Sequence, residues 1–170
     1  MTHHRVYVTV IGSSAPISEG VRRIAERVGE LLAERGAVVV TGGRGGVMEA
    51  VCRGARRAGG LTVGILPGVD RSEANEYVDV AIPTGMLHAR NAINVLAGDA
   101  VIAIGGGPGT LSEIGLALAY GKPVVAIRGT GGVADLLAEK EVGGERVLAA
   151  ATPEEAVEKA LEEARKRQAY

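Results

Sequence analysis

Residues 101–104 form a short apolar run, Val-Ile-Ala-Ile, that leads directly into three consecutive glycines. The run is too short for a helix and predicts a buried strand of a parallel sheet. Gly105–Gly107 permit a tight turn and a close approach to a ligand, because they lack the Cβ atom that would clash. Pro108 fixes its own φ, and Thr110 is expected to cap a helix. A strand, a glycine loop and a helix N-terminus together predict an anion site, for which phosphate is the commonest biological occupant.

Composition limits what such a chain can do. With 170 residues, of which 46% are hydrophobic, the chain can bury a substantial core, and we expect one domain over residues 1–170. The formal net charge of −1 argues against nucleic acid polymers and membrane surfaces as partners. Only 2% of the residues are aromatic, which argues against a platform that stacks single-stranded bases. No segment has the length of a membrane span or the apolar stretch of a signal peptide, so a cytoplasmic location is predicted.

Short apolar segments alternate with longer helical ones along the chain. Strands are predicted at residues 6–11, 38–40, 61–66, 78–82, 101–104, 124–127 and 147–149. Helices are predicted at residues 18–36, 47–58, 86–96, 110–120 and 133–139, and after a capping box at 152–155. This alternation predicts an α/β fold, a Rossmann-like doubly wound parallel sheet of about seven strands with helices on both faces.

Three glycine-containing loops follow the first, second and fifth predicted strands. In a parallel sheet these loops meet at the carboxyl edge, where ligands bind at the change of strand order. We therefore expect them to hold a phosphate or a nucleotide. The candidate binding residues are Gly12, Ser13, Ser14, Gly42, Gly43, Arg44, Gly45, Gly105, Gly106, Gly107, Gly109 and Thr110. Turn capping by Ser13 and Ser14 and a solvated position for Arg44 are equally good alternatives.

Several common site patterns are missing from the sequence. A dinucleotide dehydrogenase would carry Gly-x-Gly-x-x-Gly after its first strand, where this chain has Gly-Ser-Ser-Ala-Pro. No Walker A loop occurs either. His3, His4 and His88 are isolated, and Cys52 is the only cysteine, so neither a zinc site nor an internal disulfide is expected.

Two segments carry a resemblance to a known family. Residues 105–113, Gly-Gly-Gly-Pro-Gly-Thr-Leu-Ser-Glu, resemble the Pro-Gly-Gly-x-Gly-Thr-x-x-Glu signature of the Lonely-guy family. Residues 86–91, Met-Leu-His-Ala-Arg-Asn, resemble its Met-His-x-Arg-Lys motif, and the similarity extends from about Val6 to Val125. The resemblance implies a homodimeric nucleoside-5′-monophosphate phosphoribohydrolase, which releases a cytokinin base and requires no metal or organic cofactor.

Two positions depart from that signature, since Gly105 stands in place of Pro and Asn91 in place of Lys. In this combination the sequence is similar to a side branch of the superfamily that includes molybdenum-cofactor carrier proteins. The alternative function is therefore a non-catalytic carrier or sensor of a phosphorylated ligand such as the molybdenum cofactor, with Asn91 among the binding residues. Either function takes a phosphorylated small molecule as partner. The family's frequent label of lysine decarboxylase does not fit, because none of the four lysines lies in a glycine loop to form a Schiff base.

Glu113 and Arg90 are the candidate catalytic residues. Cleavage of an N-glycosidic bond builds positive charge on the ribose, and a nearby carboxylate can stabilise that charge and orient the attacking water. With the phosphate on the loop amides, Glu113 would lie one helical turn away, facing the ribose. Arg90 could hold the phosphate through two hydrogen bonds. The alternatives are a capping box, Thr110-Leu-Ser-Glu113, and a surface ion pair for Arg90.

Overall fold

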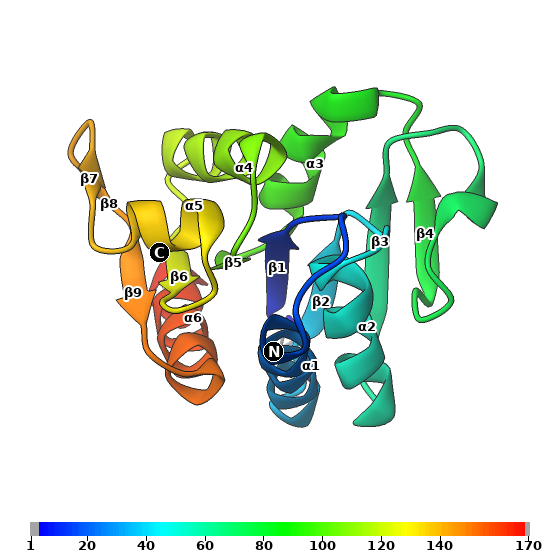
Figure 1. Ribbon diagram of the computed structural model, residues 1–170, viewed down its shortest axis with the longest axis horizontal. Helices are drawn as coiled ribbons and strands as arrows, with labels where there is room; N and C mark the ends of the chain where they lie inside the picture. Colours follow the sequence, from blue (N-terminus) through cyan, green and yellow to red (C-terminus); the bar gives the residue numbers. More distant parts are fainter. Residues whose placement is uncertain (1–3, 169–170) are drawn as a thin grey trace.

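The structure of the protein, a computed structural model, describes residues 4–168 (Figure 1). The strands of the main sheet are β1 (Tyr7–Gly12), β2 (Val38–Thr41), β3 (Thr62–Leu66), β4 (Val80–Pro83), β5 (Ala100–Ile104), β6 (Val124–Ile127) and β9 (Leu148–Ala150). The α-helices are α1 (Glu19–Glu34), α2 (Val47–Arg57), α3 (Arg90–Ala97), α4 (Pro108–Ala119), α5 (Gly132–Leu137) and α6 (Pro153–Gln168). The shorter elements are the 3₁₀ turns η1 (Arg71–Glu73) and η2 (Leu87–Ala89) and the hairpin strands β7 (Glu141–Val142) and β8 (Glu145–Arg146).

The seven strands of the main sheet are all parallel and follow the order β4-β3-β2-β1-β5-β6-β9. The chain moves outward from β1 to β4 and then returns to the other side of β1 with β5. The predicted doubly wound parallel sheet of about seven strands is therefore confirmed. Strand order reverses between β1 and β5, where Gly12 is in register with Ile104, so the loops that follow these two strands begin side by side.

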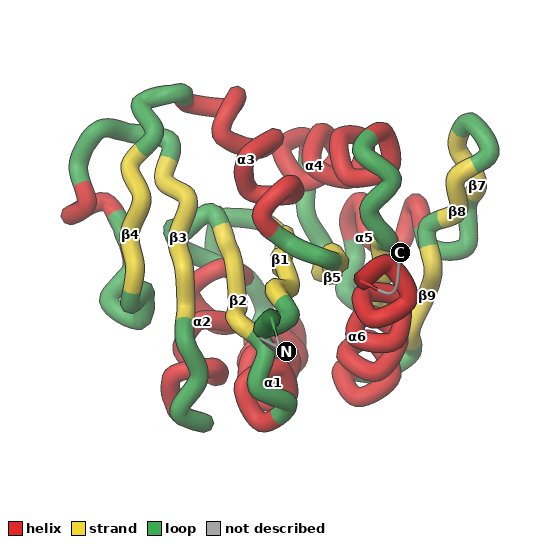
Figure 2. Tube along the Cα trace, turned by 180° about the vertical axis from the view of Figure 1, so that it is seen from behind, coloured by secondary structure: helices red, strands yellow, loops and turns green. Residues whose placement is uncertain are grey.

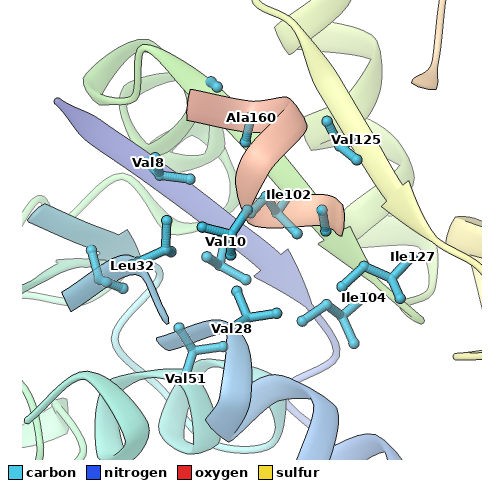
Figure 3. Close-up of a cluster of buried hydrophobic side chains, with 14 of the residues drawn as sticks. Val8, Val10, Val28, Leu32, Val51, Ile102, Ile104, Val125, Ile127 and Ala160 are labelled. Atoms are coloured by element: carbon cyan, nitrogen blue, oxygen red, sulfur yellow. The ribbon is translucent and has the colours of Figure 1, made fainter. Parts of the chain in front are cut away.

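Helices cover both faces of the sheet, as predicted (Figures 1 and 2). On one face α1, α2 and α6 enclose a cluster of aliphatic side chains that includes Ile102 and Ile104 (Figure 3). On the other face α3, α4 and α5 enclose a second cluster that includes Val101 and Ala103. Because alternate side chains of β5 point to opposite faces and both faces are covered, the strand has to be apolar throughout.

Two predicted helix starts are confirmed. Ser18 caps α1, and its hydroxyl accepts the N–H of Val21 at 3.2 Å. Thr152 caps α6, since the N–H of Glu155 donates to its hydroxyl at 3.1 Å, whereas the Glu155 carboxyl accepts the N–H of Ala151 rather than that of Thr152. Within residues 4–168, no helix is both long and apolar enough to cross a membrane.

Other local predictions are wrong or cannot be compared. α4 begins at Pro108, two residues before the expected cap Thr110, because proline suits the first turn and Gly107 takes the N-cap position. The expected helix at 86–96 starts as an α-helix only at Arg90, since Leu87 has a φ of +50° that an α-helix does not contain. The hairpin of β7 and β8 was not expected, because its residues are exposed and show no apolar alternation. His3 lies outside the described residues.

Candidate functional site

The loop after β5 is shaped by its glycines and held by the next loop and helix. Gly105 and Gly106 have φ angles of +57° and +96°, in the region that favours glycine. Their carbonyl oxygens accept the N–H groups of Ala134 and Val133, both at 3.0 Å. The N–H of Gly105 donates to the Thr130 hydroxyl at 2.9 Å. The loop is therefore fixed in one conformation by the start of α5.

The same loop leads into α4, whose first turn contains backbone N–H groups without a hydrogen-bond acceptor. Gly107 is the N-cap and makes no side-chain capping hydrogen bond. Within residues 4–168, the N–H groups of Gly109 and Thr110 find no acceptor. Free amides at a helix N-terminus favour an anion. Phosphate binding by this loop stays a prediction, with a geometry suited to it.

The loop after β2 supplies Arg44 and gives room to Arg90. A Cβ atom on Gly42 would collide with the Arg90 guanidinium, so the absence of a side chain at Gly42 lets this group enter the site. Arg44 Nη1 lies 3.2 Å from Glu73 Oε2. Two guanidinium groups from different elements thus reach the same edge of the sheet.

A cavity of about 400 Å³ lies at this edge, next to the loops after β1, β2 and β3. Half-buried Arg90 forms part of its wall, and its Nη1 donates to the carbonyl oxygen of Ile65 at 2.9 Å. Burial lowers the pKa of Arg90, whereas the charge of Glu113 raises it. The lining residues are Ser14, Arg44, Gly45, Pro67, Leu87, His88 and Arg90. The cavity thus combines two guanidinium groups with a few apolar side chains.

Four of the candidate residues from the sequence line this cavity, namely Ser14, Arg44, Gly45 and Arg90. Sequence reasoning does not identify Pro67, Leu87 or His88. Only their positions in the sequence could have indicated a place in the site. Pro67 follows a strand that ends at the same edge of the sheet, and Leu87 and His88 lie within the motif at 86–91. Within residues 4–168, no group of three or more His, Cys, Asp or Glu side chains is placed to hold a metal ion.

The remaining candidates lie outside the cavity wall. They are Gly12, Ser13, Gly42, Gly43, Asn91, Gly105, Gly106, Gly107, Gly109, Thr110 and Glu113. A Cβ atom on Gly12 would lie 2.7 Å from the carbonyl oxygen of Ile104, so Gly12 permits close packing at the change of strand order. Asn91 Nδ2 donates to the Ser112 hydroxyl at 2.9 Å, which in turn donates to the carbonyl of Gly109 at 2.7 Å. The amide nitrogen of Asn91 therefore serves a local network.

Glu113 is buried, with 7% of its surface exposed. Its Oε2 accepts a hydrogen bond from Asn94 Nδ2 at 2.7 Å, so the alternative, a capping box in which Glu113 reaches back to Thr110, does not form. Burial raises the pKa of Glu113 to about 7, although Asn94 and the charge of Arg90 lower it. A carboxyl group with this pKa can both hold and release a proton near neutral pH.

The two oxygens of Glu113 differ in their surroundings. Within residues 4–168, Glu113 Oε1 has no hydrogen-bond partner and keeps some contact with solvent. Asn94 Oδ1 is the one side-chain nitrogen or oxygen that is both fully buried and unpaired in this part of the chain. The carboxyl group is thus held through Oε2, while Oε1 is available to water or a ligand.

The family model described as the SLOG cluster4 family matches residues 5–157. A cytokinin riboside 5′-monophosphate phosphoribohydrolase from Mycobacterium tuberculosis is 34% identical over 71% of this chain and 69% of its own length. A molybdenum cofactor binding protein from the phototrophic bacterium Rippkaea orientalis has a structure that matches with a TM-score of 0.86 and 38% identity, over 95% of this chain and 98% of that one. The Moco carrier protein of Chlamydomonas reinhardtii matches with a TM-score of 0.84 and 35% identity, over 96% and 99% of the two chains.

Proposed function

Because the chain belongs to the SLOG cluster4 family, we propose that it binds a nucleoside 5′-monophosphate and hydrolyses the N-glycosidic bond to free base and ribose 5-phosphate. The observation that carries this proposal is the state of Glu113, a buried carboxyl group whose pKa lies at about 7. One of its oxygens is held by Asn94 and the other is unpaired. The similarity to a mycobacterial phosphoribohydrolase supports the same reaction.

Arg44 and Arg90 are the groups suited to the phosphate. Both line the cavity, and guanidinium groups bind phosphate oxygens through pairs of hydrogen bonds. The unused amides at the start of α4 offer further donors at the same edge. The ligand would thus be held by its charge, and the ribose would extend toward Glu113.

The chemistry that follows uses Glu113 as a base. As the bond between C1′ and the base nitrogen breaks, its electron pair goes to the base and positive charge builds on the ribose. The ionised carboxyl group stabilises this charge. Water adds to C1′ and gives a proton to Glu113 Oε1, while the departing base gains a proton from solvent. Glu113 then releases its proton, which a pKa of about 7 permits at neutral pH.

Release of free base is the direct test of this proposal. The purified protein is incubated with AMP, GMP, CMP, UMP and a cytokinin riboside monophosphate, and free base and ribose 5-phosphate are measured. We expect release from at least one substrate, at a rate that falls below pH 7 as Glu113 takes up a proton. Tight binding of these compounds with no release would contradict the hydrolysis and favour a carrier.

A specific observation favours that second function. Asn91 stands where the Lonely-guy signature has lysine, and its amide nitrogen is bonded to Ser112, so this position brings no positive charge to the site. Structural neighbours at 35–38% identity are described as molybdenum cofactor binding or carrier proteins. The second candidate is therefore a non-catalytic carrier of a phosphorylated ligand such as the molybdenum cofactor.

We also propose that two copies of the chain associate through α3 and α4. These helices pack against each other, and their outer surface exposes Ile93, Leu96, Leu111 and Tyr120. A second copy would remove this apolar surface from water. Light scattering should give twice the chain mass for the wild type, and Leu96→Arg with Leu111→Arg should give a monomer. A cytoplasmic location stays a prediction.

A further inference from the structure

Leu87 has a left-handed backbone conformation that its place in the chain does not explain. Its φ is +50°, and the other non-glycine residue with a positive φ among residues 4–168 is Glu139, at +65°. Glu139 comes just after α5, where helices commonly end with a left-handed residue. Leu87 opens η2 and follows no helix end. Strained residues of this kind cluster at ligand sites, where the surrounding structure holds them.

Backbone hydrogen bonds hold this strained segment in place. Three N–H groups within residues 84–87 donate to carbonyl oxygens of residues 66–68, at 2.8 to 3.1 Å. One of them joins the N–H of Leu87 to the carbonyl of Pro67 at 2.9 Å. The Leu87 side chain takes little part in this packing, because the residue is 69% exposed. The protein therefore keeps a strained leucine whose side chain is not used in its own core.

That side chain lines the same cavity as the two arginines. Leu87 and Pro67 form its apolar part, whereas Arg44 and Arg90 supply positive charge. A ligand that bound only to the two arginines would leave the Leu87 side chain exposed to water. A ligand that joins a phosphate to a flat apolar ring would satisfy both parts, since burial of apolar surface is favourable.

We propose that Leu87 is a specificity-determining residue whose side chain packs against the face of the nucleobase of a ligand held by its phosphate at Arg44 and Arg90. The inference rests on the proposed function, because it takes the cavity as the phosphate site. The strained φ directs the leucine to the cavity, and the bonds to residues 66–68 keep it there. Leu87 thus adds affinity for nucleotides and none for the sugar phosphate alone.

Two substitutions at Leu87 distinguish the effect of its side chain on binding from the effect of its strained backbone. Leu87→Gly removes the side chain and adopts a positive φ without strain, and Leu87→Asn keeps a side chain of moderate size that tolerates this conformation. Both variants should melt at or above the temperature of the parent protein. Leu136→Ala, at a leucine that is 64% exposed and outside the cavity, is the matched control.

Calorimetry then measures the binding of two ligands, ribose 5-phosphate and whichever of AMP, GMP, CMP and UMP binds most tightly. Every protein in this experiment, the parent included, also carries Glu113→Gln, so that the nucleotides are not hydrolysed. We expect both Leu87 variants to bind the nucleotide at least about tenfold more weakly, with ribose 5-phosphate unchanged and the control equal to its parent. Unchanged nucleotide affinity, or an equal loss for both ligands, would overturn the role of Leu87 and leave the phosphate site standing. A parent protein that binds neither compound would overturn the phosphate site itself, and this inference with it.

Discussion

Thr110-Leu-Ser-Glu113 and Thr152-Pro-Glu-Glu155 share the same spacing of threonine and glutamate, and each lies at the start of a helix. At 152–155 the threonine caps the helix, because the Glu155 N–H donates to the Thr152 hydroxyl at 3.1 Å. The carboxyl group of Glu155 accepts the N–H of Ala151 at 2.8 Å. Thr152 thus satisfies an N–H of the first turn of α6, and Glu155 satisfies the N–H of the residue before the cap.

At 110–113 the same pattern of threonine and glutamate has a different structural role. Pro108 starts α4 earlier, so Thr110 lies inside the first turn and has no cap to form. Glu113 is then buried against α3 and bonds to Asn94. Burial raises the pKa of Glu113 to about 7, whereas the hydrogen bonds from Ala151 and Lys159 lower the pKa of Glu155. The difference teaches that surroundings in three dimensions, rather than the local pattern, decide whether such a glutamate bonds to the backbone at a helix start or is buried with a raised pKa.

The largest expected difference between the two glutamates is in turnover. Glu113→Gln should lower the rate of base release by about 100-fold or more, because the amide can neither take a proton nor stabilise the positive ribose. Glu155→Gln, far from the cavity, should leave the rate within about twofold. Initial rates at pH 8 under saturating substrate measure both. Equal rates for wild type and Glu113→Gln would remove Glu113 from the reaction.

The same two substitutions should change stability in opposite directions. Between pH 4.5 and about 7 the folded protein keeps the Glu113 proton that the unfolded chain releases, so stability falls as pH rises through this window. At pH 8 the buried charge of Glu113 lowers the free energy of unfolding by on the order of 3 kcal/mol. Glu113→Gln removes this charge, so it should restore much of the lost stability at pH 8 and change stability little at pH 4. Glu155 has a lowered pKa, so its stabilisation is present at neutral pH and is lost in acid. Glu155→Gln should therefore destabilise the protein at pH 8, and by a smaller amount at pH 4, where part of the stabilisation by Glu155 is already lost.

Urea unfolding of the three proteins at pH 4 and pH 8 measures these differences. The sign of each difference matters more than its size. A Glu113→Gln variant that is less stable than wild type at pH 8 would contradict the raised pKa. It would also indicate that Glu113 serves the fold much as Glu155 does.

The fold could be predicted from the sequence because its signals are local. The run at 124–127 is apolar at every position, and Ser18 and Thr152 precede helices with the residues that caps require. These features depend on neighbours a few residues away. The alternation of strands and helices then predicts a doubly wound parallel sheet, whereas the order of its strands comes from the structure.

The site could be predicted only in outline, because its contacts join distant segments. The glycine loops and Arg90 are visible as motifs, but nothing in the sequence pairs Asn94 with Glu113 or makes room for Arg90 beside Gly42. The strained φ of Leu87 depends on hydrogen bonds to residues 66–68, which come from another loop. Such features depend on the packing of helices, strands and loops that are distant in the sequence, so they could not be predicted from the sequence alone.

Asn94 offers a smaller change that affects one glutamate and not the other. Asn94→Leu replaces the amide that donates to Glu113 by an apolar side chain of similar size, so the pKa of Glu113 should rise further above 7. Base release should then fall several-fold at pH 7 and recover toward the wild-type rate at higher pH. Carboxyl signals in ¹³C NMR follow both groups in one titration, and the Glu155 signal is the internal control. A Glu113 midpoint that does not move would contradict the role of Asn94.

The two threonines should differ by the smallest amount, in stability alone. Thr152→Val removes the hydroxyl that accepts the Glu155 N–H, and should cost about 1 kcal/mol of unfolding free energy. Thr110→Val removes a hydroxyl for which no partner is found within residues 4–168, so unfolding should change by less than about 0.5 kcal/mol. Urea unfolding at pH 7 compares them. If Thr110→Val proved as costly as Thr152→Val, the first pattern would contribute to helix stability after all, and Glu113 would no longer stand apart from an ordinary capping glutamate.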